Sequence, residues 1–366
     1  MAPLPPGATV GIIGGGQLGR MLAMAAARLG YRTIVLEPQA DCPAAQVANR
    51  QIVGAYDDAY ALAELARASA VVTYEFENVP VEAVNELVAD VPVLPPPAAL
   101  EAAQDRLVEK NFLTGLGLAT APYRAVDGMD DLKAGLAAFG GAGILKTRRF
   151  GYDGKGQARI APDRPGSAEA AWAELGGRPL ILEGVVDFRA EISIVAARGA
   201  DGGLAAYDPA ANVHRDGILR SSTVPAGISD KVGGSARAAA FAILDALFYV
   251  GVIGVEFFVT RDGRLLVNEI APRVHNSGHW TEAACAVSQF EQHIRAVCGL
   301  PLGDTARHSD CVMENLIGDE VARAPALLAE PGLVLHLYGK AEARPGRKMG
   351  HFTKLGSRQS AVGNRT

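Results

Sequence analysis

The first third of the chain alternates apolar strand patterns with helical patterns, and this alternation restricts the fold more than any other feature. The apolar runs TVGIIG, YRTIVLE and AVVTYEF, at residues 9–14, 31–37 and 70–76, are separated by helical stretches such as QLGRMLAMAAARLG. Strands that alternate with helices pair in parallel, because each helix returns the chain across the sheet. Residues 1–100 are therefore predicted to form an open α/β domain with a Rossmann-like parallel sheet.

A glycine pattern joins the first predicted strand to the first predicted helix. Gly14, Gly16 and Gly19 spell G-x-G-x-x-G, a turn whose exposed backbone N–H groups and helix dipole favour an anion or polar ligand. Glu37 follows about 20 residues later, where a dinucleotide-binding domain places the acid that contacts the ribose. Taken alone, these residues favour an NAD-dependent oxidoreductase.

A change of pattern after the first hundred residues predicts two further domains. Pro95–Pro97 mark a connector, because consecutive prolines continue neither a strand nor a helix interior. A helix is expected over 100–117, in LEAAQDRLVEKNFLTGLG. We expect the second domain to cover 101–304, with an antiparallel lid over about 122–190, and a small strand-rich domain to cover 305–366.

Composition and charge describe a globular protein and argue against one class of partner. The chain has 366 residues, of which 49% are hydrophobic and 20% charged, so a large buried core is expected and disorder is not. The net charge of −5 gives no overall attraction to nucleic acid, and no polynucleotide partner is expected.

The sequence also predicts where the protein works. The most apolar stretch, 238–259, contains Asp245 and Glu256, which a membrane span rarely accepts, and the N-terminus lacks a secretory pattern. We therefore expect a cytoplasmic protein with no membrane partner. The four cysteines are far apart in the sequence, at Cys42, Cys285, Cys298 and Cys311. This spacing indicates neither a zinc site nor disulfide bonds.

The segment EFFVTRDGRLLVNE places two glutamates opposite each other in a predicted β-hairpin. Asp262–Gly263, between two apolar runs, indicates a two-residue loop that pairs Phe258 with Val267. This loop also sets Glu256 directly opposite Glu269, with their Cβ atoms about 4.5–5.5 Å apart. Opposed like charges destabilise a hairpin unless a cation lies between them, and Mg²⁺, which prefers oxygen ligands, fits that role. A longer or bulged loop would instead leave both glutamates solvated at an ordinary edge.

A glycine-rich loop follows another predicted strand in LKTRRFGYDGKGQARI, where Lys146 ends the strand. Gly151, Gly154 and Gly156 allow this loop to turn its backbone N–H groups toward phosphates. The loop lacks the Walker A spacing, because Lys155 precedes a glycine rather than Ser or Thr. It is either a different phosphate-binding device or a simple turn.

With these motifs in place, the chain resembles the ATP-grasp superfamily, and within it the N5-carboxyaminoimidazole ribonucleotide synthetases of purine biosynthesis. The resemblance covers nearly the whole chain, through GIIGGGQLGRM, TYEFENVP, LKTRRFGYDGKGQ, LEGVVDFRAEISI, NEIAPRVHNSGHWT and YGKAEARPGRKMGH. It implies an α/β protein with an ATP-grasp fold, in which the N-terminal domain is a pre-ATP-grasp domain. It also implies an ATP-dependent ligase that joins bicarbonate to 5-aminoimidazole ribonucleotide through carboxyphosphate.

The resemblance implies that ATP lies between two antiparallel sheets. Arg106 and Lys146 would reach its phosphates, the glycine-rich loop would close over them, and the LEGVV segment would meet the adenine. Glu191 would accept the ribose hydroxyls, with His214 near the nucleotide. The residues implied to bind ATP are Arg106, Lys146, Gly151, Tyr152, Asp153, Gly154, Lys155, Gly156, Gln157, Glu183, Gly184, Val185, Val186, Glu191, His214, Asn268 and Glu269.

The resemblance assigns Mg²⁺ to the same two glutamates that the hairpin register opposes. Glu256 and Glu269 are implied to be its ligands, with Asn268 adjacent. Many ATP-grasp enzymes have a third ligand, an Asn, where this chain has Ala271. The third protein ligand is therefore left open, and water or ATP oxygens could complete the octahedral shell.

Catalytic roles are hypothesised for residues near the metal and in the loop. Arg273 and His275 would hold bicarbonate or the departing phosphate, although His275 could equally be a structural histidine. Asp153, with Tyr152, would orient the amine or take its proton, unless it simply favours a turn. The catalytic set is Asp153, Arg273, His275 and Lys340.

A local basic cluster, GKAEARPGRKMGH, suits the 5′-phosphate of a ribonucleotide in an otherwise acidic chain. A solvated basic turn is the alternative. Strand-end residues in YEFENVP and the glycine turn are implied to meet the sugar and base. The residues implied to contact 5-aminoimidazole ribonucleotide are Gln17, Leu18, Glu75, Asn78, Tyr152, Asp153, Arg273, Lys340, Arg347 and Lys348.

Rival functions explain less of the chain. The oxidoreductase hypothesis leaves the opposed glutamates, the Lys146 loop and the basic cluster without a role. The motifs YEFENVP and RPGRKMGH argue against the two sister ligases, a formate-using glycinamide ribonucleotide transformylase and a biotin carboxylase. The resemblance implies ATP, bicarbonate and 5-aminoimidazole ribonucleotide as the small-molecule partners, and a homodimer.

Overall fold

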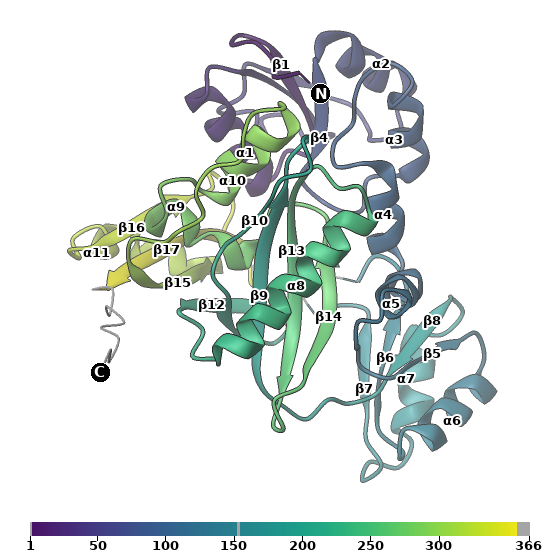
Figure 1. The fold of residues 1–366 in the computed structure, drawn as a ribbon. Helices are drawn as coiled ribbons and strands as arrows, with labels where there is room; N and C mark the ends of the chain where they lie inside the picture. Colours follow the sequence, from purple (N-terminus) through teal and green to yellow (C-terminus); the bar gives the residue numbers. More distant parts are fainter. Residues whose placement is uncertain (1, 152–153, 357–366) are drawn as a thin grey trace.

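The computed structural model describes residues 2–151 and 154–356, arranged as an N-terminal domain, a large central sheet and a smaller lid sheet (Figure 1). The N-terminal elements are β1 (Thr9–Ile13), α1 (Gln17–Arg28), β2 (Arg32–Leu36), β3 (Arg50–Ile52), α2 (Ala59–Ala68), β4 (Val71–Tyr74) and α3 (Val81–Leu87). The strands pair in the order β3-β2-β1-β4, and every pair is parallel. The predicted open α/β domain is confirmed.

Two helices connect this domain to the rest of the chain, α4 (Pro97–Gln104) and α5 (Arg106–Gly115). The prediction of a single helix over 100–117 is wrong, because the helix is interrupted at Asp105. The carboxylate of Asp105 accepts hydrogen bonds from the N–H groups of Leu107 (2.8 Å) and Val108 (3.3 Å) and so caps α5. Pro97 is the first residue of α4, where a helix tolerates proline.

The lid is a four-stranded antiparallel sheet, as its sequence pattern predicts. Its elements are β5 (Tyr123–Val126), α6 (Met129–Ala138), β6 (Gly143–Thr147), β7 (Gln157–Ile160), α7 (Ser167–Leu175) and β8 (Leu180–Glu183). The strand order is β5-β8-β6-β7. Leu132, Leu145 and Leu182 belong to its own buried cluster, so the lid has a hydrophobic core separate from that of the central sheet.

The central sheet is antiparallel and carries many of the residues that line a cleft. Its first elements are β9 (Phe188–Arg198), β10 (Leu204–Ala206), β11 (Ala210–Arg215), β12 (Ile218–Val224), α8 (Asp230–Ala246), β13 (Gly251–Thr260), β14 (Leu265–Ala271), η1 (Asn276–Gly278), α9 (Thr281–Ala284) and α10 (Gln289–Val297). Ile243 of α8 packs with Ile194 and Val255 in one buried cluster, which holds α8 against the sheet (Figure 1).

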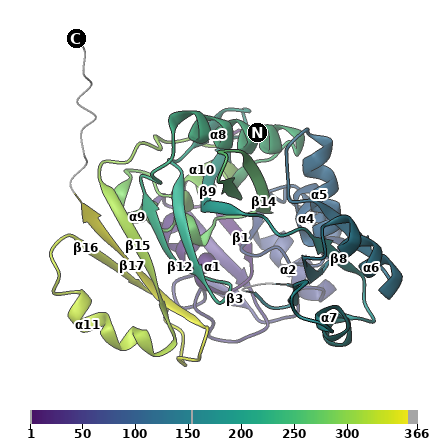
Figure 2. The same ribbon diagram turned by 90° about the horizontal axis from the view of Figure 1, so that it is seen from below.

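The C-terminal strands extend the central sheet rather than forming a sheet of their own. Their elements are β15 (Asp310–Ile317), η2 (Gly318–Arg323), α11 (Ala324–Leu327), β16 (Leu333–Leu337) and β17 (Lys348–Gly356). β15 pairs with β12, and the sheet runs in the order β14-β13-β9-β11-β12-β15-β17-β16. The lid and these strands lie on opposite sides of the molecule (Figure 2).

Two further predictions concern the interior. All four cysteines are free and buried. Within residues 2–151 and 154–356, no helix combines the length and the apolar character needed to cross a membrane.

His293 on α10 connects the N-terminal domain to the central sheet. Its Nδ1 accepts a hydrogen bond from the N–H of Val252 (3.1 Å), and its Nε2 lies 2.7 Å from Oγ1 of Thr73 on β4. Because Nδ1 is the acceptor, Nε2 carries the proton and donates to Thr73. Burial lowers the pKa of His293 to about 3, so the ring is neutral in the folded protein.

This buried histidine predicts loss of stability in acid. Below pH 6.5 the unfolded chain takes up a proton at His293 that the native state excludes, so stability falls as pH drops from 6.5 toward 3. One such group lowers the free energy of unfolding by about 2 kcal/mol between pH 6.5 and 5. Thermal unfolding midpoints of wild type and His293→Gln across this range measure the effect. The variant should show a shallower pH dependence, the exposed His308→Gln should match wild type, and identical curves for all three would contradict the assignment.

Candidate active site

A cleft of about 440 Å³ lies where the lid, the β13–β14 hairpin and the N-terminal domain meet. Residues distant in the sequence, predicted from separate motifs, converge on it. The predicted site residues that line the cleft are Gln17, Leu18, Asn78, Arg106, Lys146, Gly151, Gly154, Lys155, Gln157, Glu191, His214, Glu256, Asn268, Glu269, Arg273, His275 and Lys348.

The hairpin that carries the two glutamates differs from the predicted register but keeps their opposition. Thr260 donates its N–H to the carbonyl of Arg264 (2.9 Å), so the loop has three residues rather than two. Phe257, not Phe258, is therefore paired with Val267. The two-residue loop and the Phe258–Val267 pair are wrong, because Gly263 adopts a positive φ of 83° in the longer turn.

A bulge corrects the shift before the glutamates are reached. The register changes between Glu256 and Phe257, where Asn268 is the extra residue on β14, and Glu256 is again paired with Glu269. The alternative considered from sequence, a longer or bulged loop, is thus present. It leaves Glu256 largely shielded from solvent, because that side chain is only 13% exposed, whereas the side chain of Glu269 is 40% exposed.

Helix α5 braces the bulged strand from the side. Nζ of Lys110 donates to the carbonyl of Asn268 (2.6 Å), and the carboxylate of Glu109 accepts the N–H of Ile270 (2.6 Å). β14 is the edge of the central sheet, so these side chains bond to backbone groups that no further strand covers. The bulge is therefore held in place by α5, the helix that begins with Arg106.

The two glutamates have divergent electrostatic environments. Burial, followed by repulsion from Glu269, raises the pKa of Glu256 to about 7. Burial alone would also raise the pKa of Glu269, but Arg106 and Lys146 outweigh it and hold that pKa below its ordinary value. Nη1 of Arg106 lies 3.2 Å from Oε2 of Glu269. Glu269 is thus compensated by two nearby cations, whereas the charge of His214 offsets the rise at Glu256 only in part.

Buried charges from β8 and α5 surround Lys146, the next-to-last residue of β6. Nζ of Lys146 lies 2.9 Å from Oε2 of Glu183, and Nζ of Lys110 lies 4.0 Å from the same oxygen. Burial lowers the pKa of Lys146. Glu183, expected from the resemblance to meet adenine, does not line the cleft. It is buried between the two lysines, and its Oε1 has no hydrogen-bond partner among the described residues.

Two polar residues on the sheet floor form a pair. Nδ1 of His214 on β11 lies 2.5 Å from Oε2 of Glu191 on β9. Burial alone would lower the pKa of His214, but the hydrogen bond and charge of Glu191 raise it above its ordinary value. The pair presents a carboxylate and an imidazole to the cleft, the groups that bind hydroxyls.

Arg273 and His275 follow β14 and lie beside the carboxylates of Glu256 and Glu269. Nε of Arg273 donates to Oε2 of Glu77 at 2.5 Å. Nε2 of His275 lies 3.6 Å from Oε1 of Glu256, and its Nδ1 lies 2.8 Å from Oγ of Ser277. Burial, followed by the charge of Arg273, lowers the pKa of His275 to about 3. A neutral imidazole and a fixed guanidinium therefore stand beside the glutamate pair.

A second pocket of about 310 Å³ adjoins the cleft, and Gln17 lines both. The predicted residues Glu75, Lys340 and Arg347 line this pocket and not the cleft. Lys340 is held by the carbonyl of Lys348, to which its Nζ donates at 2.8 Å. The pocket thus sets two cationic side chains opposite the glycine turn.

The glycine turn is occupied by protein carboxylates. Glu75 accepts the N–H groups of Gly16 and Gly19, the latter at 2.5 Å, and Oε2 of Glu37 accepts the N–H of Gly15 at 2.9 Å. These N–H groups are the ones that a dinucleotide pyrophosphate would need. Glu37, the expected ribose-binding acid of the oxidoreductase hypothesis, instead fixes the turn.

Comparison with known proteins identifies the family. The sequence matches the family models of the ribonucleotide synthetase preATP-grasp domain over residues 7–104, the ATP-grasp domain over 111–290 and the phosphoribosylaminoimidazole carboxylase C-terminal domain over 311–365. The N5-carboxyaminoimidazole ribonucleotide synthase of Brucella melitensis is 66% identical over 352 residues, which cover 96% of this chain and 97% of that protein. This chain belongs to the N5-carboxyaminoimidazole ribonucleotide synthase family.

Solved structures support the family assignment and the fold. The ADP complex of an N5-carboxyaminoimidazole ribonucleotide synthetase superposes with a TM-score of 0.93 at 42% identity, covering 97% of this chain and 94% of that one. The Aspergillus clavatus N5-carboxyaminoimidazole synthase in complex with ADP and 5-aminoimidazole ribonucleotide gives a TM-score of 0.90 at 31% identity, covering 96% and 94%. The predicted ATP-grasp fold is confirmed, and the oxidoreductase hypothesis is set aside.

Some residues expected from the family resemblance lie elsewhere. Tyr152 and Asp153 are outside the described residues. Gly156 and the segment Gly184–Val186, which follows β8, do not line the cleft. The described part of the lid and loop supplies to this family site Ile144, Lys146, Arg148, Phe150, Gly151, Gly154, Lys155 and Gln157.

Sequence reasoning missed, among others, Glu77, which lines the cleft of this family member, and Lys110, which supports the bulged strand from α5. Glu77 lies between two selected residues in YEFENVP, and its acidic side chain at a strand end was a usable signal. Lys110 gave no signal, because a lysine in a helical pattern is typical of a solvated face. In the structure it is fully buried and bonds to the bulge.

We expect Lys110→Met to destabilise this synthase-family protein by about 3 kcal/mol, because removing one partner of a buried charge cluster leaves Glu183 and the Asn268 carbonyl incompletely paired. Urea unfolding measures the loss. Glu183→Gln should cost less in the Lys110→Met background than in wild type, because the two residues share one cluster. Lys133→Met, on the exposed face of α6, is the control, and equal effects of Lys110→Met and Lys133→Met would contradict this account.

Proposed function

We propose that this chain catalyses the ATP-dependent carboxylation of 5-aminoimidazole ribonucleotide with bicarbonate, giving N5-carboxyaminoimidazole ribonucleotide, ADP and phosphate in purine biosynthesis. The observation that carries the proposal is a single cleft that combines positively charged side chains suited to binding phosphate, an opposed glutamate pair and Arg273. Family membership supports it, since one relative is an N5-carboxyaminoimidazole ribonucleotide synthase and a related structure holds ADP with 5-aminoimidazole ribonucleotide.

We assign Mg²⁺ to Glu256 and Glu269. The pair fits a dication, because burial and mutual repulsion raise the pKa of Glu256 to about 7 and an oxygen-seeking cation relieves that repulsion. When bound, the ion would neutralise charge on the transferring phosphoryl group. Asn268 stands beside the pair, whereas Ala271 offers no side-chain ligand, so water or phosphate oxygens would complete the shell.

ATP fits the part of the cleft between the lid and the central sheet. Arg106 and Lys146 neutralise its phosphates, with backbone N–H groups of the loop 151–157. Glu191 and His214, which line this cleft, receive the ribose hydroxyls. Glu183 acts through Lys146, whose ammonium it holds in the cleft wall.

The chemistry requires bicarbonate to be activated, because it is a poor electrophile at neutral pH. Transfer of the γ-phosphoryl group to a bicarbonate oxygen gives carboxyphosphate and releases ADP. The amine of the ribonucleotide then attacks the carbon of carboxyphosphate, or of the CO₂ it yields. Phosphate leaves, and the amine loses one proton.

The residues after β14 would handle these intermediates. Glu77 bonds Nε of Arg273, and Nη1 donates to the carbonyl of Val274 (3.2 Å). The N–H groups of Nη2 and the second N–H of Nη1 would then clamp bicarbonate or phosphate. Neutral His275 can hydrogen-bond either species. Asp153, outside the described residues, is proposed to orient the amine or take its proton.

The ribonucleotide fits the second pocket and its border with the cleft. Lys340, Arg347 and Lys348 supply positive charge for its 5′-phosphate. Gln17 lines both cavities and, with Leu18 and Asn78, would face the sugar and aminoimidazole. Glu75 acts through the glycine turn, because both of its oxygens accept N–H groups there.

A coupled ADP-release assay tests the function. We expect ADP formation only with both bicarbonate and 5-aminoimidazole ribonucleotide, and none above background with glycinamide ribonucleotide plus formate or with biotin. The reason is that the basic side chains of the second pocket can bind the phosphate of a ribonucleotide, and Arg273 can bind bicarbonate. ADP release that prefers glycinamide ribonucleotide or biotin would contradict the proposal in favour of a sister ligase.

One variant in the same assay isolates the amine step. Asp153→Ala should abolish carboxylation while Mg²⁺-dependent ATP binding stays within about twofold of wild type, since a base affects the proton and not the phosphates. Asp163→Ala, an exposed acid in the turn before α7, is the matched control. Normal turnover by Asp153→Ala would remove that residue from the mechanism.

We further propose that the protein works as a homodimer in the cytoplasm and without a nucleic-acid partner. The family resemblance supports the dimer, the nucleotide substrates and the reduced cysteines support the compartment, and the negative net charge disfavours nucleic acid.

A further inference from the structure

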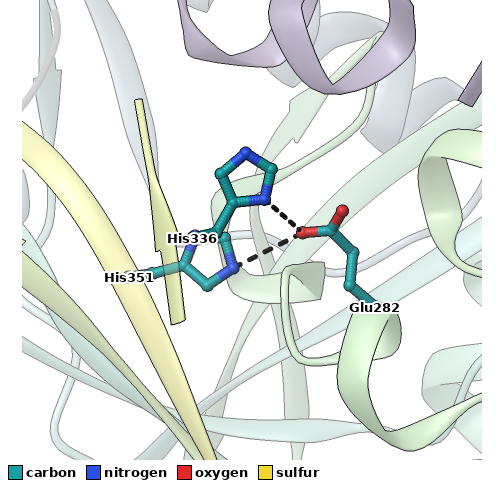
Figure 3. Close-up of side chains that lie close together, drawn as sticks. All are labelled: Glu282, His336 and His351. Carbon is teal, nitrogen blue, oxygen red and sulfur yellow. Dashed lines mark ion pairs between the residues drawn. The ribbon is translucent and has the colours of Figure 1, made fainter. Parts of the chain in front are cut away.

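A second group of metal-type ligands lies outside the cleft, where the C-terminal strands meet α9. His336 on β16 and His351 on β17 are directly paired across the antiparallel strands, so both rings stand on one face of the sheet. Glu282 of α9 faces them, and its Oε2 lies 3.3 Å from Nδ1 of His336 and 3.5 Å from Nε2 of His351 (Figure 3). None of the three lines the cleft or the second pocket.

The separations are those of ligands around one metal ion. Zinc bonds of about 2.0–2.1 Å at tetrahedral angles set neighbouring ligand atoms about 3.3–3.4 Å apart. A charge-assisted hydrogen bond between the same groups would be about 2.7–2.9 Å long. The distances at Glu282 match the former, and the ligand atoms of all three residues lie within 4.8 Å of one another.

The surroundings prepare these groups for coordination. Nδ1 of His351 lies 2.8 Å from the hydroxyl of buried Tyr338, and donation there leaves the lone pair on Nε2, toward Glu282. A carboxylate and an imidazole nitrogen with a free lone pair are the forms that bind metals.

A second observation also indicates that a polar group belongs in this region. His279 packs on His351 with ring centroids 4.7 Å apart. Its Nδ1 meets Nε2 of Gln289 at 3.1 Å, but its Nε2 is buried and has no hydrogen-bond partner within the described part of the chain. Buried polar atoms are normally satisfied, by water where the protein offers nothing.

We propose that Glu282, His336 and His351 bind a divalent transition metal of the zinc class, with water as the fourth ligand. Two imidazole nitrogens select this class over Mg²⁺, which prefers oxygen ligands. The side chain of Glu282 is 27% exposed, so the ion has a route from solvent. It would fasten α9 to β16 and β17, and it is distinct from the Mg²⁺ assigned to the Glu256–Glu269 pair.

Metal binding by the chelator-treated, full-length protein tests the proposal, with Mg²⁺ kept in excess to occupy the cleft. Calorimetric titration should find one equivalent of Zn²⁺, and Co²⁺ should give the visible absorption of a tetrahedral site. Zn²⁺ at about 100 times its Kd should raise the thermal midpoint by about 3–5 °C. No Zn²⁺ uptake by wild type would overturn the proposal. Glu282, His336 and His351 would then form only an ion-pair contact between α9 and the strands β16 and β17.

Variants locate the site. His336→Ala and Glu282→Gln should each weaken Zn²⁺ binding by at least about tenfold and remove the Co²⁺ spectrum, because each removes a ligand. Glu282→Gln keeps the shape of the side chain and serves if His336→Ala folds poorly. The exposed His308→Ala should match wild type. Unchanged Zn²⁺ affinity in both ligand variants would place the metal elsewhere and refute the assignment.

Discussion

The repulsion between two opposed carboxylates, one of them largely shielded from solvent, is the interaction on which the rest of this site depends. Glu256 and Glu269 are paired across β13 and β14, a position in which like charges destabilise a hairpin. Arg106 and Lys146 hold the pKa of Glu269 below its ordinary value. At Glu256, burial and then the repulsion of Glu269 raise the pKa, and His214 offsets them only in part. A divalent cation restores the balance, and the same cation is what phosphoryl transfer requires.

The scaffold around this pair is arranged to keep the opposition despite a loop of the wrong length. A three-residue turn alone would shift Glu256 away from Glu269, and the bulge at Asn268 reverses the shift. α5 bonds the strand at the bulge residue Asn268 and again at Ile270, two residues further on, while its first residue, Arg106, contacts Glu269. The helix that neutralises the metal-type carboxylate therefore also fixes its register. Structural and catalytic roles are joined in one element, so neither can change alone.

Sequence reasoning reached the parallel domain, the lid and the opposed glutamates, because strand periodicity and a hairpin signal are local. It mistook the loop length, since a DG dipeptide is compatible with both two- and three-residue turns. The break at Asp105 was missed because the apolar spacing continues through it. Glu75 and Glu183 were assigned to ligands, whereas the fold uses them to hold the glycine turn and Lys146. A sequence shows which residues carry charge but not which partners tertiary packing gives them.

The most direct test of the central claim is the Mg²⁺ dependence of nucleotide binding in the variants Glu256→Gln, Glu269→Gln and Glu314→Gln. Titration with a non-hydrolysable ATP analogue, with and without Mg²⁺, measures it. Replacing either opposed glutamate should abolish the gain in affinity that Mg²⁺ gives, with metal-free affinity retained, because one ligand and one buried charge are lost together. Glu314→Gln, on β15, should behave as wild type. Full Mg²⁺ dependence in Glu256→Gln and Glu269→Gln would show that the cation binds elsewhere and that this account is wrong.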